Sequence, residues 1–232
     1  MNTGAINLGN PVSSSPLNRG LVGWWLALPS RMFGRNIMDL CTPQKHGAFV
    51  NDPAWQSARG RPGGWGSIAL DGNDGYISVP TISLGTTAVT VAVWARPDDM
   101  TTDDYLSSHS GNAIALIKGY QDNNFNCLIG GNYPTGTAAN SQIAGTALEW
   151  QHIAYSSNGS TCSGYLNGVK VISSIASRNC GANSTASIGA ITTPGNWFGG
   201  ALDDYRAWSR SLADDEVRAI YNDSRTGYPQ TL

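Results

Sequence analysis

Hydrophobic and polar residues alternate along short stretches of the chain, with the period of two that is typical of β-strands. The clearest stretch is residues 89–97 (VTVAVWARP), where both alternating sets are largely apolar, as in a central strand covered on both faces. Residues 20–28 (GLVGWWLAL) predict a first core strand with Trp24 and Trp25 on opposite faces. Shorter strands are expected at residues 113–118, 125–129 and 150–156. The pattern therefore predicts an all-β protein.

Residues with turn chemistry connect these stretches. Residues 67–79 (SIALDGNDGYISV) predict a strand, a turn and a second strand. The acidic turn suggests calcium, but an EF-hand counted from its first Asp needs Gly and Glu where this chain has Tyr76 and Ile82. Asn167 and Gly168 lie between two β-favouring runs, which predicts a hairpin with a type I′ turn and positive φ at both residues.

The chain has one convincing helical pattern, at residues 211–221. Ser211 is expected to be the N-cap, with Asp214 three residues later and further acidic residues in the first turn. The apolar residues of this segment form a stripe that can pack on a sheet. The helix is expected to end near Asn222, before a Gly and a Pro.

Two adjacent aspartates precede this helix, within an alternating stretch at residues 202–208. Strict alternation places Asp203 and Asp204 on opposite faces of a strand, so we expect Asp203 to point inward and Asp204 to face solvent. A buried carboxylate must be satisfied by hydrogen-bond donors or by a metal ion. For Asp203 we prefer backbone N–H donors from a covering loop.

Composition limits the class of protein. The 232 residues are 41% hydrophobic and only 13% charged, with a formal net charge of −2. This length and composition favour a single domain, and the low charge excludes nucleic acid and anionic membrane surfaces as main partners. The sequence shows no apolar run long enough to span a bilayer and no pattern of an export signal.

Four cysteines are too few and too scattered for a disulfide scaffold or a zinc site: Cys41, Cys127, Cys162 and Cys180. Cys162 and Cys180 could meet across neighbouring strands. We prefer the alternative, in which all four are buried thiols.

Three parts of the chain are expected. Residues 1–20 are rich in Gly, Asn, Ser and Pro and predict an extended arm, held by its own domain or by a neighbouring subunit. Residues 21–223 form the β-sandwich domain, and residues 224–232 form a tail. Within the domain, residues 29–66 are expected to be long, largely irregular and on the surface.

Four segments, in order, resemble laminin-G-like domains of the concanavalin A-like lectin and glucanase family. They are LDGNDGYISVP at 70–80, VTVAVWARP at 89–97, EWQHIAYSSNG with GYLNGVKV across 149–171, and SIGA with FGGALDDYRAWSRSLADDEVRAIY across 187–221. The resemblance implies a jelly-roll sandwich of two antiparallel sheets with one short C-terminal helix. The patterns of strands, hairpin and helix favour a sandwich independently.

Where members of this family bind calcium, the resemblance implies Asp39 and Asp203 as metal ligands. The Gly- and Asn-rich run that often follows the first ligand in the family is replaced here by residues 40–47 (LCTPQKHG). No cofactor is required by the sequence, and Ca²⁺ is the one that the family suggests.

Catalysis has little support in the sequence, so we predict that the protein is not an enzyme. Glycoside hydrolysis normally needs two carboxyl groups that flank the scissile bond. The chain has only two glutamates: Glu149 precedes a predicted strand and Glu216 lies in the first turn of the predicted helix, so neither alternates with a second carboxylate along a strand. His46, His109 and His152 show no spacing of a metal or acid–base pair.

Binding remains, through loops at the ends of the sandwich or through an exposed sheet face. We expect a platform of loop aromatics: Trp55, Trp65, Tyr120, Tyr133 and Trp197.

Two functional hypotheses follow. The first is a structural or adhesion protein on the surface of a bacteriophage-like virion, as a decoration, fibre or tail-associated component. It would attach to capsid or tail subunits through residues 1–20 and form a homo-oligomer, with host glycan binding as a second function. The alternative is an extracellular, lectin-like carbohydrate-binding module, with calcium as an optional ligand.

Overall fold

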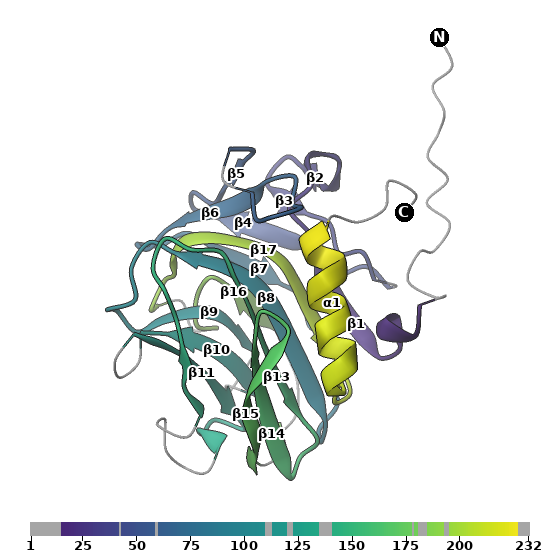
Figure 1. Ribbon diagram of the computed structural model, residues 1–232. Coiled ribbons are helices and arrows are strands. Elements are labelled where there is room, and N and C mark those ends of the chain that lie inside the picture. Colours follow the sequence, from purple (N-terminus) through teal and green to yellow (C-terminus); the bar gives the residue numbers. More distant parts are fainter. Residues whose placement is uncertain are drawn as a thin grey trace.

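The computed structural model describes residues 15–226, apart from residues 42, 59, 110–112, 120–122, 135–140, 178, 181–184 and 193–194. Within this range the chain forms two packed antiparallel sheets, and one α-helix lies on the outside of one sheet (Figure 1). The predicted all-β sandwich with a C-terminal helix is therefore confirmed.

The first sheet, sheet A, contains the longest strands. Its spatial order is β15 (Val169–Ala176), β14 (Thr161–Leu166), β13 (Gln151–Ser157), β8 (Val89–Pro97), β17 (Gly199–Trp208), β6 (Ser67–Asp71) and β5 (Ala54–Gln56), with β1 (Leu21–Trp25) also paired to β17.

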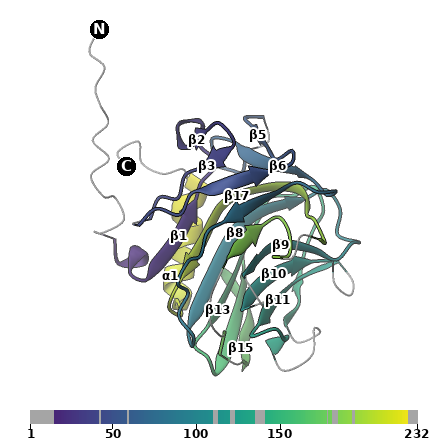
Figure 2. The ribbon, with the colours of Figure 1, turned by 180° about the vertical axis from the view of Figure 1, so that it is seen from behind.

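The second sheet, sheet B, packs against sheet A and is seen best from behind (Figure 2). Its order is β12 (Ile143–Ala144), β11 (Asn124–Ile129), β10 (Ile114–Lys118), β9 (Asp104–His109), β16 (Ala186–Ile188), β7 (Tyr76–Val79), β4 (Gly47–Val50), β3 (Asn36–Ile37) and β2 (Met32–Phe33). The helices are the 3₁₀ turns η1 (Pro16–Asn18) and η2 (Pro29–Arg31) and the α-helix α1 (Asp214–Thr226).

The core lies between the sheets, and β8 shows how the sequence specifies it. Its four odd-numbered residues, from Val89 to Ala95, are buried in the inter-sheet core, whereas Ala92 packs against α1 on the outer face. Both faces of β8 are thus covered, as the sequence predicts. Trp24 and Trp25 also point to opposite faces, and both are buried.

The remaining strand predictions can be compared with the structure. Strands are present at each expected position, and the Asn167–Gly168 turn has φ values of 51° and 74°, which confirms the hairpin. Residues 29–66 are largely irregular, as predicted, but the short strands β2 to β5 within this segment were not foreseen. These strands have two to four residues each, too few for alternation to be recognised.

The helix differs from its prediction at both ends. It begins at Asp214, and the Ser211 hydroxyl is hydrogen-bonded to that of Ser156 at 2.9 Å, so Ser211 is not its N-cap. Instead, the Glu216 carboxylate accepts the N–H of Ala213 at 2.9 Å. The helix continues to Thr226 rather than stopping near residue 222, so it enters the predicted tail. The sequence between Asp214 and Thr226 contains no Gly or Pro that would end the helix.

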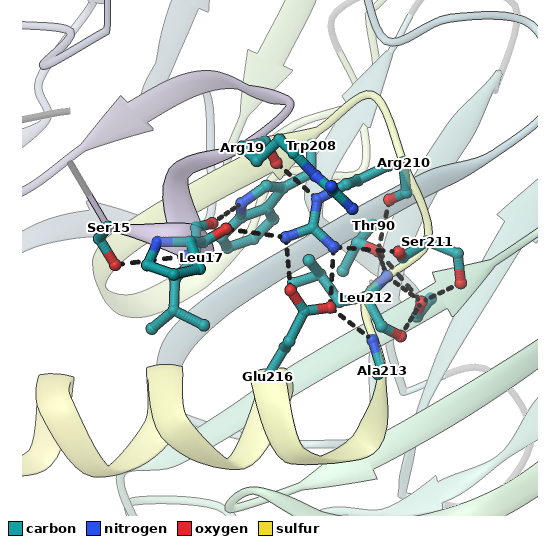
Figure 3. A network of polar contacts seen from close by, with 12 residues as sticks. Ser15, Leu17, Arg19, Thr90, Trp208, Arg210, Ser211, Leu212, Ala213 and Glu216 are labelled. Atoms are coloured by element: carbon teal, nitrogen blue, oxygen red, sulfur yellow. Dashed lines mark hydrogen bonds and ion pairs between the residues drawn. The ribbon is translucent and has the colours of Figure 1, made fainter. Parts of the chain in front are cut away.

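Residues 15–20 are held by their own domain (Figure 3). The indole N–H of Trp208 donates to the Leu17 carbonyl at 2.8 Å, and the Arg210 guanidinium donates to the Arg19 carbonyl. The same guanidinium forms an ion pair with Glu216 at 2.7 Å. This part of the predicted arm is therefore a clasp between β1 and the start of α1, and residues 1–14 lie outside the described range.

All four cysteines are buried free thiols in the structure, as preferred from the sequence. No helix among the described residues is long and apolar enough to cross a membrane.

Candidate functional site: the acidic end of the sandwich

The strands of both sheets end in two sets of loops, at opposite ends of the sandwich. In sheet A, Gly199 pairs with Asp71, Gly200 pairs with Pro97, and Gln151 pairs with Ala95, so these strand ends lie together. The loops there connect β4 to β5, β6 to β7, β8 to β9, β10 to β11, β12 to β13, β14 to β15 and β16 to β17. We call this set of loops the acidic end.

Negative charge is concentrated at this end. Its exposed carboxylates are Asp52, Asp71, Asp74, Asp98, Asp103 and Glu149. At the opposite end, the segments that connect β7 to β8, β9 to β10, β11 to β12, β13 to β14, β15 to β16 and β17 to α1 contain no Asp or Glu in the sequence. Among these connecting loops, acidic residues are therefore concentrated at one end, whereas the carboxylates of the other end belong to the first turn of α1, at Asp214, Asp215 and Glu216.

Some of these carboxylates shape their own loops. Asp71 accepts the backbone N–H groups of Asn73 at 3.0 Å and Gly75 at 3.3 Å, and the bond from Asn73 is the largest of those that lower its pKa. Asp99 accepts the N–H of Thr101 at 2.8 Å. Short Asp-centred turns of this kind explain why the sequence places acidic residues between strands. They also fix the loops in one conformation.

One buried lysine balances part of the charge. Lys118 is fully buried, and its ammonium group lies 2.7 Å from Asp104, 3.0 Å from Asp99 and 2.9 Å from the Thr102 hydroxyl. Burial is the largest single influence on Asp99 and opposes its ionisation, but the hydrogen bonds from Lys118 and Thr101 and the charge of Lys118 together outweigh it and lower the pKa to about 2. Asp103 has the opposite shift, because burial and the neighbouring Asp104 raise its pKa.

An exposed leucine with unusual backbone geometry lies in the loop between β12 and β13. Leu148 is 57% exposed and has a φ of +64°, a conformation that costs a branched side chain free energy. Its N–H donates to the Pro97 carbonyl at 2.7 Å, and the Gln151 amide binds both backbone groups of Thr146 at 2.7 and 3.1 Å. The loop is thus held rigidly with an apolar side chain in solvent.

Aromatic side chains lie beside the acidic residues. Tyr105 donates its backbone N–H to Asn196 at 2.9 Å and forms a bridge with Trp197, while the Asn196 amide donates to the Asp103 carbonyl at 2.7 Å. Both rings are partly exposed. The combination of aromatic faces, an exposed aliphatic group and oxygen acceptors fits hydroxyl-bearing ligands with apolar C–H faces.

The structure does not gather the predicted aromatic residues on one platform. Trp197 belongs to the acidic end, but Tyr133 packs on the outer face of sheet B against a small apolar cluster that also contacts Tyr105. Trp55 donates its indole N–H to the Ala27 carbonyl, and Trp65, 51% exposed, lies in the separate loop between β5 and β6. The fifth residue, Tyr120, lies outside the described residues.

Sequence analysis did not name as site residues the following members of the acidic end: Asp98, Asp103, Tyr105, Leu148 and Asn196. The sequence does carry one usable signal, because the connections from β6 to β7, β8 to β9, β10 to β11 and β12 to β13 contain acidic residues and those from β7 to β8, β9 to β10 and β11 to β12 do not. The positive φ of Leu148 has no signal in composition or periodicity.

Asp39, a predicted metal ligand, is in a different place, buried near β1. Its carboxylate accepts the backbone N–H groups of Trp24, Cys41 and Lys45, each at 2.9 Å. Burial raises its pKa, and these three bonds act in the opposite direction. Cys41 and Lys45, which lie where the family often has a Gly- and Asn-rich run, thus bind this carboxylate through their backbone.

Asp203, the other predicted ligand, is buried on the outer face of sheet A. It accepts the N–H of Ala27 at 2.8 Å, as expected for a carboxylate satisfied by a covering loop, and pairs with Arg61 at 2.8 Å. Burial raises its pKa to about 6 against the opposing charge of Arg61. Arg61 also donates to the Ser224 carbonyl, so it links the loop between β5 and β6 to the end of α1.

The prediction that Asp204 faces solvent was wrong. Asp204 is 1% exposed, and it accepts bonds from Arg206 at 2.9 and 3.0 Å and from the Trp24 indole at 2.7 Å. Burial opposes its ionisation, but the guanidinium of Arg206 and that of Arg61 lower its pKa. The cause of the error is a β-bulge between Asp203 and Arg206, with φ of +52° at Asp204, which turns both carboxylates to the same side.

Metal ligands and acid–base groups are the remaining candidates for chemistry. Among the residues that the structure describes, no group of three or more His, Cys, Asp or Glu side chains is placed to hold a metal ion. His109 lies 2.7 Å from the Tyr205 hydroxyl and His152 packs between Trp94 and Tyr221, and burial lowers the pKa of both histidines to about 3. Calcium binding stays a prediction.

Comparisons with known proteins agree with this architecture. Residues 71–218 match the family model of the concanavalin A-like lectin/glucanases superfamily. A search of curated protein sequences finds no significant match.

Similar solved structures come from larger carbohydrate-active and toxin proteins. Trypanosoma rangeli sialidase in complex with sialic acid has a TM-score of 0.65 at 15% identity, covering 91% of this chain and 34% of that one. Domain 4 of AbnA, a GH43 extracellular arabinanase from Geobacillus stearothermophilus in complex with arabinotriose, has a TM-score of 0.59 at 16% identity, covering 87% and 98%. The binding domain of Paraclostridial Mosquitocidal Protein 1 has 0.61 at 20%, covering 89% and 53%. The chain spans about a third of the sialidase.

Proposed function

The chain belongs to the concanavalin A-like lectin/glucanase superfamily, and we propose that it is a non-catalytic carbohydrate-binding module. Its ligand-contacting surface is the acidic end. The observation that carries this proposal is that exposed carboxylates share one end of the sandwich with the exposed Leu148 and the bridged pair of Tyr105 and Trp197. Pre-organised loops favour binding, because little conformational entropy is lost when the ligand binds.

The charge at this end selects the class of glycan. Six exposed carboxylates share it, whereas Lys118 is buried between two of its acidic neighbours and Arg96 pairs with Asp98 at 3.4 Å. An anionic sugar would therefore meet unscreened repulsion within a Debye length of about 8 Å at physiological ionic strength. The ligand is an uncharged or amine-bearing oligosaccharide, with carboxylates as acceptors for its hydroxyl or ammonium groups.

The comparisons support this proposal to different degrees. The arabinanase domain, which this chain matches over nearly its whole length, was solved with arabinotriose, an uncharged sugar. The sialidase was solved with sialic acid, but the chain corresponds to only a third of that protein. A non-catalytic role is supported by the residues themselves, since Glu216 is engaged by Arg210 and the buried histidines have low pKa values.

Three trisaccharides of equal length test the site: arabinotriose, a glucosamine trimer and trigalacturonic acid. Calorimetry at low salt should detect the first or second and not the third. Replacing Asp98 and Asp103 together by Asn should weaken binding of the glucosamine trimer about tenfold, or about 1.4 kcal/mol. The matched control removes the same two charges from the exposed surface of α1, with Asp215→Asn and Asp223→Asn, and should leave affinity unchanged.

Two results would contradict the proposal. One is stronger binding of the anionic trisaccharide than of the others. The second is a glycan array that shows no binding at all, with and without calcium or a chelator. A calcium requirement, in contrast, would support the predicted metal dependence and would reopen the search for its ligands.

A role in a larger assembly is a second proposal. We predict a virion-surface or extracellular location and a homo-oligomer from the sequence. Residues 15–20 are bound to their own domain, so attachment to other subunits falls to residues 1–14. Deletion of residues 1–14 should leave a folded domain that no longer joins its assembly, and unchanged incorporation would contradict the attachment role.

A further inference from the structure

We propose that Lys118 is a built-in cation: its ammonium group occupies a site at the acidic end that suits a divalent metal ion, and it holds the loop between β8 and β9 in one conformation. The side chain is fully buried, although it lies at the end of β10 among carboxylates. This site is separate from Asp39 and Asp203, the ligands implied by the family resemblance. Its effect on glycan binding rests on the proposed function, whereas the cation site itself does not.

The ammonium group has one oxygen acceptor for each of its three N–H bonds. Its nitrogen lies 2.7 Å from a carboxylate oxygen of Asp104, 3.0 Å from one of Asp99 and 2.9 Å from the Thr102 hydroxyl. The hydroxyl in turn donates to Asp104 at 2.8 Å. Oxygen atoms, carboxylates above all, are the ligands that calcium takes from proteins, with water completing the shell. A lysine therefore fills a place whose chemistry is that of a metal site.

All three oxygen atoms come from residues 99–104, so the ammonium group binds one short loop to the end of β10. The residue after Lys118 shows how closely this loop approaches. Gly119 has a φ of +81°, and a Cβ atom added to it would overlap the Thr102 carbonyl oxygen. Only glycine fits such a position without strain. Lys118 and Gly119 together thus fix the place of the loop.

The same loop carries part of the proposed binding surface. The Asp103 carbonyl accepts the Asn196 amide at 2.7 Å, and the Asn196 carbonyl accepts the backbone N–H of Tyr105 at 2.9 Å. Tyr105 forms a bridge with Trp197. Lys118 itself is buried beneath the loop and does not contact the ligand. It is a positioning residue, because it acts through the loop that presents the Asp103 carboxylate.

A lysine differs from a metal ion in two respects. It is attached to the chain, so the site is occupied at any metal concentration, and it brings one positive charge to the two carboxylates of Asp99 and Asp104. Without its side chain, two carboxylates would face a buried space that is no longer neutralised, which strongly favours a free cation there. The Asp99 side chain is 48% exposed, so a cation can enter from solvent.

Lys118→Ala tests the proposal through rescue by free cations. This variant should melt about 10 °C lower than wild type, because two paired carboxylates lose their partner. Ethylammonium, which replaces the end of the missing side chain, and Ca²⁺ should each raise its melting temperature by about 5 °C at saturating concentration. Calorimetry should find one more Ca²⁺ per chain than in wild type, and the further change Asp99→Asn should remove that site.

Two control variants separate the cation site from general effects of salt and of cavities. Lys118→Met keeps the space filled, so neither cation should stabilise it. Leu116→Ala opens a buried space on the same strand without carboxylates, and it should not respond either. If Lys118→Ala is unfolded, the cations are added during refolding, and recovery of the native circular dichroism is the readout.

Failure of both cations to stabilise or refold Lys118→Ala beyond the response of Leu116→Ala would overturn the proposal, as would an equal response of Lys118→Met. Binding is a separate measurement. The trisaccharide that wild type prefers should bind Lys118→Ala about tenfold more weakly and regain its affinity with ethylammonium. Rescued stability without rescued binding would overturn the positioning role. Rescued stability with no trisaccharide bound by wild type would instead refute the proposed function and leave the cation site supported.

Discussion

Aspartates occur in two regions of this protein with opposite roles. On the outer face of sheet A, Asp203 and Asp204 are buried and paired with arginines, whereas at the acidic end Asp98 and Asp103 are exposed. The buried pair holds loops to the sheet, because an uncompensated charge there is costly. The exposed group contributes little to folding and leaves its oxygens available to a ligand. Environment, rather than residue type, separates structural from functional carboxylates.

The largest expected effect is the loss of Asp204. In Asp204→Ala, the Arg206 guanidinium and the Trp24 indole lose their bonds to this carboxylate in a buried site. The free energy of unfolding should fall by about 3–5 kcal/mol, measured by urea denaturation. Asp98→Ala is the exposed control and should change it by about 0.5 kcal/mol or less. Equal losses in both variants would remove the distinction between the two regions.

Lys118→Met tests the one buried charge within the acidic end. It leaves Asp99 and Asp104 without their shared ammonium group, and Asp104 is nearly buried. We expect a loss of about 2–3 kcal/mol in urea denaturation, because carboxylates that were paired repel each other. A loss of less than about 0.5 kcal/mol, the range of surface substitutions, would show that solvent alone can screen this end.

The pH dependence of stability distinguishes Asp203 from the exposed carboxylates. Its pKa in the folded protein, about 6, lies above the ordinary value of 3.8. Such a group stabilises the fold fully below the ordinary value, and this contribution is lost as the pH rises through about 6. Urea titrations between pH 4 and pH 7 should show this decline in the wild type and a decline smaller by about 2 kcal/mol in Asp203→Asn.

Asp99 provides the contrast, since its pKa of about 2 is lowered. Its contribution is present above 3.8 and is lost as the pH falls towards 2, outside the range of the titration. An identical pH profile in wild type and Asp203→Asn would contradict the assigned shift of Asp203.

The smallest effect concerns Leu148. Leu148→Gly relieves a φ of +64° and should raise the free energy of unfolding by about 0.5–1 kcal/mol. If the acidic end binds glycans, the same variant should bind the preferred trisaccharide more weakly, because an exposed apolar contact is removed. Val169→Gly, at a position that is 64% exposed on β15, is the control and should not gain stability.

Much of the fold could be read from local patterns. The alternation of residues 89–97, the Asn167–Gly168 turn and the amphipathic segment before residue 221 each depend on contacts within a few residues, and each prediction is confirmed in its type. The family resemblance is confirmed as well. The errors occur where short strands or capping residues depend on distant partners, as with Ser211 and Ser156.

The candidate site was less predictable. Aromatic residues were chosen because they lie in loops, but loop membership does not say which end of the sandwich a loop occupies. Trp197 and Tyr133 show this. Both were chosen as loop residues, but Trp197 lies at the acidic end, whereas Tyr133 packs on the outer face of sheet B. The acidic end becomes visible only when the order of strands in the two sheets is known.

Sequence alone determined the strands, the hairpin and the C-terminal helix, since periodicity and turn chemistry are local properties, and the family resemblance implied the concanavalin A-like sandwich. The tertiary structure decided which carboxylates are buried and paired within the fold. A single bulge at Asp203 and Asp204 reversed the side on which one of them lies, and the buried Lys118 pairs with Asp99 and Asp104 of the acidic end. Both outcomes depend on burial and on partners far away in the chain, and those set the free energy of a charge.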